Sequence, residues 1–487
     1  MPTQPVDRPR NLRLTLLGVM LAMLLAMLDN TIVGTAMPTI VGDLGGLEHI
    51  SWVVTAYTLA TAASTPVWGK FGDLYGRKVV FLASIVVFLA GSVLSGAARS
   101  MPELIGFRAL QGLGAGGIAG LAFALIGSLV SPRERGRYQG MTASVMAIGT
   151  IGGPLLGGFV TGHLGWRWAF YLNLPLGLVA LVWCHVMLRL PAARVKARID
   201  WLGIALMTVT IIAVVLAATW AGTTYAWGSW QIAALAAVTA VGLAAFVASQ
   251  RRAAEPVLPP RVFGPRNFRL ASVMVFASGA AMFGATLYLP LFQQSVQGAS
   301  ATSSGLLLLP MMLPIVVVSQ IAGKVMSRTG KYKVFPVLGA GLLTLGMLLL
   351  STMDTGTSRT LTGVFMALVG SGLGFLMQMT TTIAQNSVEM RDMGVASAGV
   401  TLFRTIGGSL GVAVFGSLFT RALQGRRPTD TGYLASAADG TQQIFLLAAV
   451  VCAIAFIAAL AVREVPLRGP GAPAQRAPGR PAVSPHA

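Results

Sequence analysis

Residues 12–40 read LRLTLLGVMLAMLLAMLDNTIVGTAMPTI, a long apolar run that contains one carboxylate, Asp29. The run exceeds the roughly 20 residues that an α-helix needs to cross the hydrocarbon core of a membrane. A charged side chain near the middle of that core costs at least about 2.5 kcal/mol, so it is kept only where it faces protein or water and has a role. We place no other acidic residue of the chain at this depth. The stretch therefore predicts a membrane helix with a functional carboxylate.

The composition extends this prediction to the whole chain. Its 487 residues are 55% hydrophobic and only 10% charged, with a mean hydropathy of +0.74. A soluble protein of this length could not cover its surface with so few charges. A net charge of +20 suggests nucleic acid as a partner in a soluble protein, but here the basic residues lie between apolar runs. We therefore predict an all-α polytopic membrane protein without a nucleic-acid partner.

Apolar runs of about twenty residues, bounded by charges or by Gly and Pro, predict fourteen transmembrane helices. Most Lys and Arg residues fall in alternate connections, which the positive-inside rule assigns to the cytoplasm together with both termini. The connection between the last two helices, with Arg421, Arg426 and Arg427, fits this topology badly because it is assigned to the outside. The predicted helices begin near residues 13, 50, 79, 102, 138, 167, 200, 229, 269, 302, 333, 360, 394 and 441.

Internal repetition predicts how these helices are grouped. Residues 69–77 recur at 323–331, and residues 150–155 recur at 405–410. Duplicated halves of this kind are how many transporters are built. We therefore predict two pseudo-repeated six-helix bundles with two helices inserted between them. The expected domains are a cytoplasmic tail (1–12), a six-helix bundle (13–190), two inserted helices with basic flanks (191–267), a second six-helix bundle (268–465) and a disordered cytoplasmic tail (466–487).

We interpret Asp29 as the residue that carries the coupling proton of a secondary transporter. Arg108, in the fourth predicted helix, differs from it in depth by only about 8 Å at about 1.5 Å per residue, and Gln111 shares the helix face of Arg108. Arginine favours the ionised carboxylate whereas burial favours the protonated one, and this balance suits a group that conformational change loads and unloads. The alternative is a static salt bridge that fixes helix packing.

The segment GKFGDLYGRK at residues 69–78 is the candidate gating loop. Its glycines allow a tight turn, its aspartate can accept hydrogen bonds from a helix N-terminus, and its basic residues anchor it on the inside. An ordinary cytoplasmic turn is the alternative, which the near-repetition at 323–333 makes less attractive. The candidate gating residues are Gly69, Asp73, Gly76, Arg77 and Lys78.

The fifth predicted helix contains GTIGGPLLGG at residues 149–158. Small residues on one face let another backbone approach closely, and a proline bends the helix, so we predict close and bendable packing between halves that rock. The thirteenth predicted helix has a weaker copy preceded by Arg404, placed at mid-membrane. Its partner is left open among backbone carbonyls, an anionic substrate group and Asp29. The candidate hinge residues are Gly149, Gly153, Pro154, Gly157 and Gly158.

Polar residues in the apolar runs are candidates for a substrate cavity. No Cys/His cluster has metal-ligand spacing, and no nucleophile and base form a recognisable constellation, so we expect no metal, no cofactor and no enzyme. The cavity candidates are Asn30, Gln111, Tyr288, Gln293, Gln294, Gln378 and Arg404.

Together these motifs resemble the major facilitator superfamily, and in particular its 14-helix drug:proton antiporter family. The resemblance covers about residues 12–463 and rests on LDNTIVGTAMPTI, GKFGDLYGRK, RALQGLGAGG, GTIGGPLLGG and WRWAFYLNLPLG. It implies that Asp29 and Arg108 act in coupling, Asp73 and Arg77 in gating, and residues 153–154 in the antiport hinge. Unlike some multidrug members, the chain has no further acidic residue in later helices that would help to bind cations.

The hypothesis that follows is a proton-coupled antiporter that exports drugs or other lipophilic small molecules by alternating access. It would act with protons, a small lipophilic substrate and membrane lipids, as a monomer. High Arg over Lys with abundant Ala and Gly suggests a bacterial genome, and hence the bacterial inner membrane. The alternatives are a dedicated exporter of one metabolite, antibiotic or lipid, and a non-transporting membrane sensor on the same fold.

Overall fold

The structure, a computed structural model, describes residues 12–45, 50–130, 132–188, 190, 199–222, 224–299, 307–389, 392–423, 430 and 432–466. These residues form sixteen helices. Eleven helical segments among them are long and apolar enough to cross a membrane, and α14 (Val334–Leu350) is a shorter apolar helix. In a bilayer only closed hydrogen bonding within each segment satisfies the backbone, which long helices achieve. The chain is therefore an all-helical, multi-pass membrane protein.

The helices pack in two groups, each with its own buried hydrophobic clusters. In the first bundle, α4 packs against α2 and α3, and α1 packs against α5 and α7. Its helices are α1 (Leu12–Leu44), α2 (Ile50–Tyr75), α3 (Arg77–Ala97), α4 (Met101–Leu129), α5 (Pro132–His163), α6 (Trp168–Tyr171) and α7 (Asn173–Met187).

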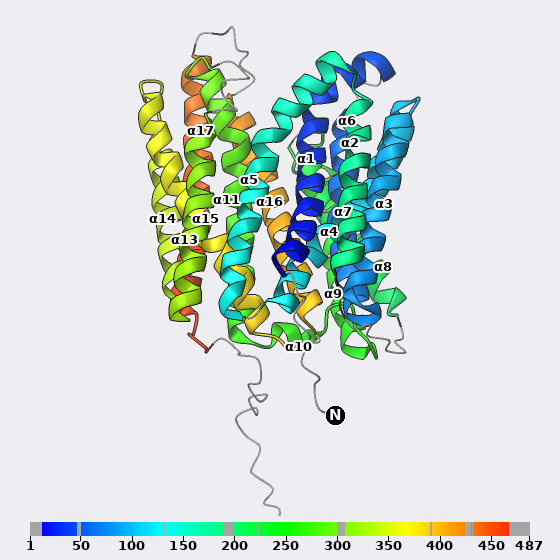
Figure 1. Cartoon of the computed structure of the whole chain (residues 1–487). Helices are drawn as coiled ribbons and strands as arrows, with labels where there is room; N and C mark the ends of the chain where they lie inside the picture. Colours follow the sequence, from blue (N-terminus) through cyan, green and yellow to red (C-terminus); the bar gives the residue numbers. More distant parts are fainter. Residues whose placement is uncertain are drawn as a thin grey trace, which may run out of the picture.

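The second bundle has matching packing partners. There α15 packs against α13 and α14, and α11 packs against α16 and α17. Besides α14, the helices of this bundle are α11 (Arg266–Ser295), α13 (Leu309–Thr329), α15 (Arg359–Asn386), α16 (Met393–Leu423) and α17 (Tyr433–Ala461). The helix α1 begins, and α17 ends, at the lower face in Figure 1, which we call the N-terminal face.

The repeated motifs occupy equivalent places in the two bundles. Gly76 between α2 and α3 has φ 96°, and Gly330 between α13 and α14 has φ 71°. Both φ values lie in the region that favours glycine, so each repeated loop turns at a glycine, although ψ differs between them (127° at Gly76 and −5° at Gly330). In the same way Gly112 of α4 meets the backbone of α2, and Gly370 of α15 meets the backbone of α13.

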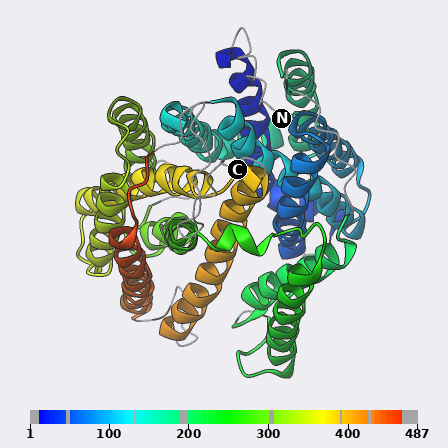
Figure 2. The same cartoon turned by 90° about the horizontal axis from the view of Figure 1, so that it is seen from below.

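Two helices, α8 (Trp201–Trp220) and α9 (Trp230–Arg252), lie together at the edge of the array, as Figure 2 shows. Helix α8 packs against α2 and α16, and so contacts both bundles. Only 6% of the apolar window of α9 is buried, so most of its apolar side chains lie at the surface of the protein. The short α10 (Pro260–Phe263) follows at the N-terminal face (Figure 1).

The predicted helix starts that fall on described residues agree with the structure within a few residues, except at two helices. Helix α5 begins at residue 132 instead of 138 and α17 at 433 instead of 441, while α13 is described from residue 309 and its predicted start at 302 lies outside the described residues. Hydropathy marks the part of a helix in lipid, whereas backbone hydrogen bonds continue through polar residues such as those at 133–139. The predicted tails at 1–11 and 467–487, and Arg426 and Arg427, lie outside the described residues.

Candidate functional site

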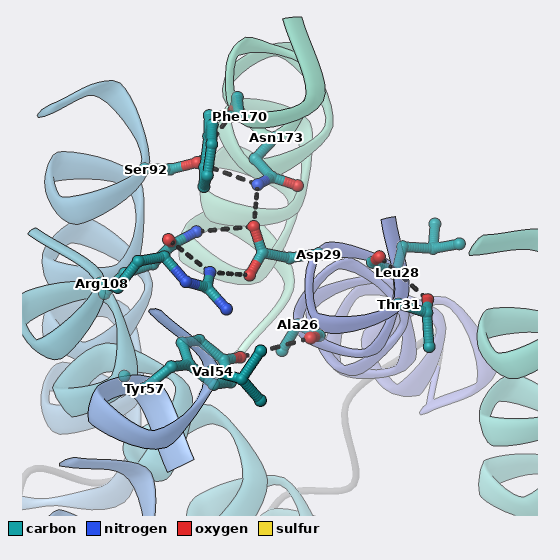
Figure 3. A network of polar contacts seen from close by, with 12 residues as sticks. Ala26, Leu28, Asp29, Thr31, Val54, Tyr57, Ser92, Arg108, Phe170 and Asn173 are labelled. Atoms are coloured by element: carbon teal, nitrogen blue, oxygen red, sulfur yellow. Dashed lines mark hydrogen bonds and ion pairs between the residues drawn. The ribbon is translucent and has the colours of Figure 1, made fainter. Parts of the chain in front are cut away.

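The carboxylate of Asp29 lies at the centre of a buried polar network that joins α1, α4 and α7 (Figure 3). Arg108 Nη1 donates to Asp29 Oδ2 at 2.6 Å, and Gln111 Nε2 donates to Oδ1 at 2.8 Å. Asn173 Nδ2 donates to the same Oδ1 at 2.7 Å. Both Asp29 and Arg108 have no exposed surface. The expected contact between these two residues is thus present, and it is fully shielded from solvent.

The Arg108 guanidinium is only partly satisfied by this network. Its Nη1 also donates to Gln111 Oε1 at 2.8 Å, while Nε and Nη2 have no hydrogen-bond partner among the described residues. The guanidinium carbon lies 4.1 Å from the centre of the Tyr57 ring, in the geometry of a cation–π contact. The positive charge of Arg108 is therefore stabilised by the Asp29 carboxylate and by the ring of Tyr57. Protonation of Asp29 would remove the stronger of these two contacts.

Asn173 and its neighbours are functional-site candidates that the sequence reasoning missed. Asn173 Nδ2 also lies 2.9 Å from Ser92 Oγ, and Ser92 donates to the carbonyl of Phe170 at 2.9 Å. The signal that could have found Asn173 is an amide side chain inside the apolar run 168–187, within the quoted segment WRWAFYLNLPLG. A buried amide needs partners, which in this bundle are supplied by α1 and α3.

The cavity candidates do not gather at one place. Gln111 was predicted to line a substrate cavity, but in the structure its side chain bonds to the Asp29 carboxylate. Tyr288 donates to the carbonyl of Val412 at 3.3 Å, which places its hydroxyl in the packing of α11 on α16. Asn30 and Gln294 are exposed, whereas Gln293 and Gln378 are buried.

The glycine face of α5 packs against α1 of the same bundle. A Cβ at Gly153 or Gly157 would collide with the hydroxyl of Thr31 or Thr35, and Thr31 Oγ1 donates to the Gly149 carbonyl at 3.1 Å. The closest neighbours of this glycine face are therefore in α1 of its own bundle and not in the second bundle as predicted, although α5 as a whole also packs against α13. Nothing lies within 4 Å of a Cβ at Gly158, and the side chain of Pro154 lies outside the described residues.

The candidate gating loop contacts the second bundle directly. Asp73 Oδ1 accepts from Gly394 N at 3.2 Å and Oδ2 accepts from Val395 N at 3.1 Å, so its carboxylate lies on the N-terminus of α16. This carboxylate suits the partial positive charge of a helix start. Arg77 pairs with Asp73 at 2.8 Å, while Lys78 donates to the His185 carbonyl in α7 at 2.7 Å.

The same face carries two further contacts through the segment between α9 and α11. Lys70 Nζ, 9% exposed, lies 2.9 Å from Glu255 Oε2, and Arg261 Nε lies 2.8 Å from Asp392 Oδ2. A Cβ at Gly69 would lie 2.8 Å from the Cβ of Ala398, so α2 and α16 nearly touch there. The N-terminal face is therefore closed in this structure.

Arg404 of α16 is buried and does not contact Asp29. Its guanidinium carbon lies 5.7 Å from the centre of the Phe123 ring of α4, and only 7% of the residue is exposed. Its Nη2 has no hydrogen-bond partner among the described residues. Of the three partners left open by the sequence, Asp29 and the backbone carbonyls of the described residues do not bind Arg404 in this conformation.

The sequence and the fold identify the family. Residues 19–412 match the model of the Major Facilitator Superfamily. The chain is 40% identical over 488 residues to an uncharacterized MFS-type transporter of Mycobacterium tuberculosis, covering 95% of this chain and 71% of that one. It is 37% identical over 419 residues to the multidrug transporter protein MdtP of Bacillus subtilis, covering 86% and 77%.

The fold is also found in solved structures. The crystal structure of the human organic anion transporter MFSD10 superposes with a TM-score of 0.66, covering 92% of this chain and 99% of that one. At 15% identity this likeness concerns the fold alone. With the family model matched over most of the chain and multidrug transporters among its relatives, this protein belongs to the major facilitator superfamily and is a transporter, not an enzyme.

Proposed function

We propose that this protein is a proton-coupled antiporter that exports drugs or other lipophilic small molecules by alternating access. The observation that supports this proposal best is the Asp29 carboxylate, fully buried in a membrane helix and held by Arg108, Gln111 and Asn173. A buried ion pair that serves packing alone could be replaced as a pair by apolar side chains of similar volume at little cost. A carboxylate with three donors around it instead suits a group whose charge changes during a cycle.

The network gives each charge state of Asp29 a different set of contacts. When Asp29 is ionised, its oxygens accept from α4 and α7, which holds these helices to α1. When it is protonated, the ion pair with Arg108 is lost, and the guanidinium keeps Gln111 Oε1 and the Tyr57 ring. A proton therefore weakens one link between α1 and α4, and this difference is what can couple proton binding to helix movement.

The proposed architecture has fourteen membrane-spanning helices, with α6 and α7 forming one span. Helices α1 to α7 and α11 to α17 are the two six-helix bundles, α8 and α9 are the insert, and the N-terminal face is cytoplasmic. In this arrangement the Asp73 carboxylate, bonded to the start of α16, would hold the cytoplasmic side closed. Breaking these contacts would be the step that admits substrate from the cytoplasm.

The substrate class comes from the relatives. One of them is named a multidrug transporter, and the apolar composition of the helices fits lipophilic molecules that enter from the bilayer. A dedicated exporter of one compound shares the same coupling site, so only transport of several unrelated dyes distinguishes the two.

The test is proton-gradient-driven efflux in proteoliposomes that hold wild type, Asp29→Asn or Asp43→Asn. Asp43 is the matched control because it lies on the same helix, half exposed, and pairs with Arg167 at 2.6 Å. The hydrogen bond from Arg167 holds the pKa of Asp43 below its usual value, so it stays ionised at neutral pH. We expect wild type and Asp43→Asn to move dye and consume the gradient, and Asp29→Asn to do neither. Equal transport by all three would refute a coupling role for Asp29.

A further inference from the structure

Arg404 carries a buried positive charge for which the described part of the chain supplies no counter-charge. Its guanidinium makes no hydrogen bond and no ion pair with any described residue, and Nη2 is enclosed without a partner. An arginine cannot relieve this situation by losing its proton. Leaving a charge unpaired away from water is among the most costly arrangements in a protein, so the site requires an anion or water for part of its cycle.

None of the ion pairs among the described residues includes Arg404. Asp29 is held by three donors in the first bundle, and four other carboxylates pair with other cations. No acidic residue lies within α15 or α16. Those four ion pairs are Asp43 with Arg167, Asp73 with Arg77, Glu255 with Lys70, and Asp392 with Arg261. Because the Asp29–Arg108 pair is neutral as a whole, Arg404 adds an uncompensated charge to the interior.

The position of Arg404 is where a transported molecule would pass. It lies about 16 Å along α16 from Met393 at about 1.5 Å per residue, near the middle of a 31-residue helix. Its guanidinium reaches from the second bundle toward the ring of Phe123 in the first bundle. A group bound here would touch both bundles, and its contacts would change when the bundles move relative to each other.

We propose that Arg404 binds an anionic group of the exported molecule, such as a carboxylate or a sulfonate, with the apolar part of that molecule lying against Phe123. This inference rests on the proposed function and specifies its substrate class as amphipathic anions. The planar guanidinium presents pairs of N–H donors that match the oxygens of such groups. The alternative source of the same chemistry is the phosphate of an anionic lipid.

The experiment measures binding of a fluorescent aromatic carboxylate and of its neutral primary amide to purified full-length protein in nanodiscs. The variants are Arg404→Gln, Arg404→Lys and, as a matched control, Arg421→Gln at the far end of the same helix. We expect wild type and Arg421→Gln to bind the carboxylate at least about tenfold more tightly than the amide, since a hydrogen-bonded charge contributes that much. Arg404→Gln should bind both probes equally, and Arg404→Lys should retain part of the preference.

Stability provides a second readout that separates loss of binding from loss of folding. Because Arg404→Gln removes an unpaired buried charge, we expect its ligand-free thermal midpoint to equal or exceed that of wild type. A lower midpoint would mean that the guanidinium already has a partner in the folded protein, and would overturn the proposal. So would the absence of a carboxylate preference in wild type.

Three further outcomes distinguish a lipid site, a failed anion site and a failed antiporter proposal. If carboxylate binding disappears in nanodiscs that contain anionic lipid but persists in neutral lipid, the site belongs to a lipid headgroup and the substrate assignment fails. If wild type exports the amide in a gradient-dependent and Asp29-dependent manner without preferring the carboxylate, the anion site fails while the antiporter stands. If the carboxylate binds at Arg404 but no gradient drives either probe, the antiporter proposal fails instead.

Discussion

The Asp29–Arg108 pair can be tested with a double-mutant cycle built from Asp29→Asn and Arg108→Gln. Both side chains have no exposed surface and are joined at 2.6 Å, so each single change leaves a buried group without its main partner. Breaking a buried pair in this way costs about 3–5 kcal/mol of the free energy of unfolding. Replacing both members removes both charges, and the remaining amides can still bond to each other and to Asn173.

The double variant should therefore be more stable than Asp29→Asn, even though it carries one more substitution. We expect a coupling energy of about 3 kcal/mol or more, against the roughly 0.5 kcal/mol within which independent sites add. The assay is unfolding in mixed micelles, followed by a probe of helix content, for wild type and the three variants. Proton-driven transport by the same preparations should be absent in the double variant, which separates folding from coupling.

A coupling energy within about 0.5 kcal/mol of zero would refute this reasoning, because it would mean that the two charges do not sense each other in the membrane. The half-exposed pair of Asp43 and Arg167 is the control for the method and should show a much smaller coupling. Full proton-driven transport by the double variant would refute the functional half of the argument, whatever its stability.

Three other predictions follow from the contacts described. Asn173→Ala leaves one bond to the carboxylate unmade and should cost about 1–3 kcal/mol of stability, measured in the same unfolding assay, and an unchanged stability would contradict the bond. Gly153→Leu should abolish transport because its side chain would collide with α1, whereas Gly158→Leu should be tolerated, and equal activity of the two would disprove the packing. We call the contact of the Asp73 carboxylate with the main-chain amides of α16 the latch. Asp73→Ala should open the N-terminal face and so speed maleimide labelling of Ala398→Cys, a position that is buried while this contact is intact.

Much of the architecture could be predicted because lipid imposes simple rules. Long apolar runs mark the helices, and the repeated loops of the two bundles both turn at a glycine with positive φ, Gly76 and Gly330. Asp29 and Arg108 stood out for the same reason, since a charge in an apolar run is rare and invites a search for its partner at the same depth. Depth along a helix follows from residue number alone, and it was sufficient to bring these two together.

What could not be predicted is the rotation of each helix about its axis. Whether the glycine face of α5 meets α1 or the other bundle depends on that rotation, and the prediction chose the wrong neighbour. Gln111 was a candidate both for the Arg108 face of its helix and for a substrate cavity. The sequence shows which helix face Gln111 occupies, but not that this face lies against Asp29. Asn173 was not predicted as a site residue because a single amide among apolar residues is a weak signal. Only the structure shows that its side chain lies 2.7 Å from the Asp29 carboxylate.

The latch at the N-terminal face has one partner that mutation can hardly change. Asp73 bonds to two main-chain amides of α16, and these exist in any sequence that forms the helix. A side chain at Gly394 would collide with the Asp73 carboxylate, so that position admits only glycine if the latch is to close. Natural variation that adjusts how readily the carrier opens at the N-terminal face is therefore expected at Asp73 and at Arg77, which pairs with it, and not at the main-chain amides of α16.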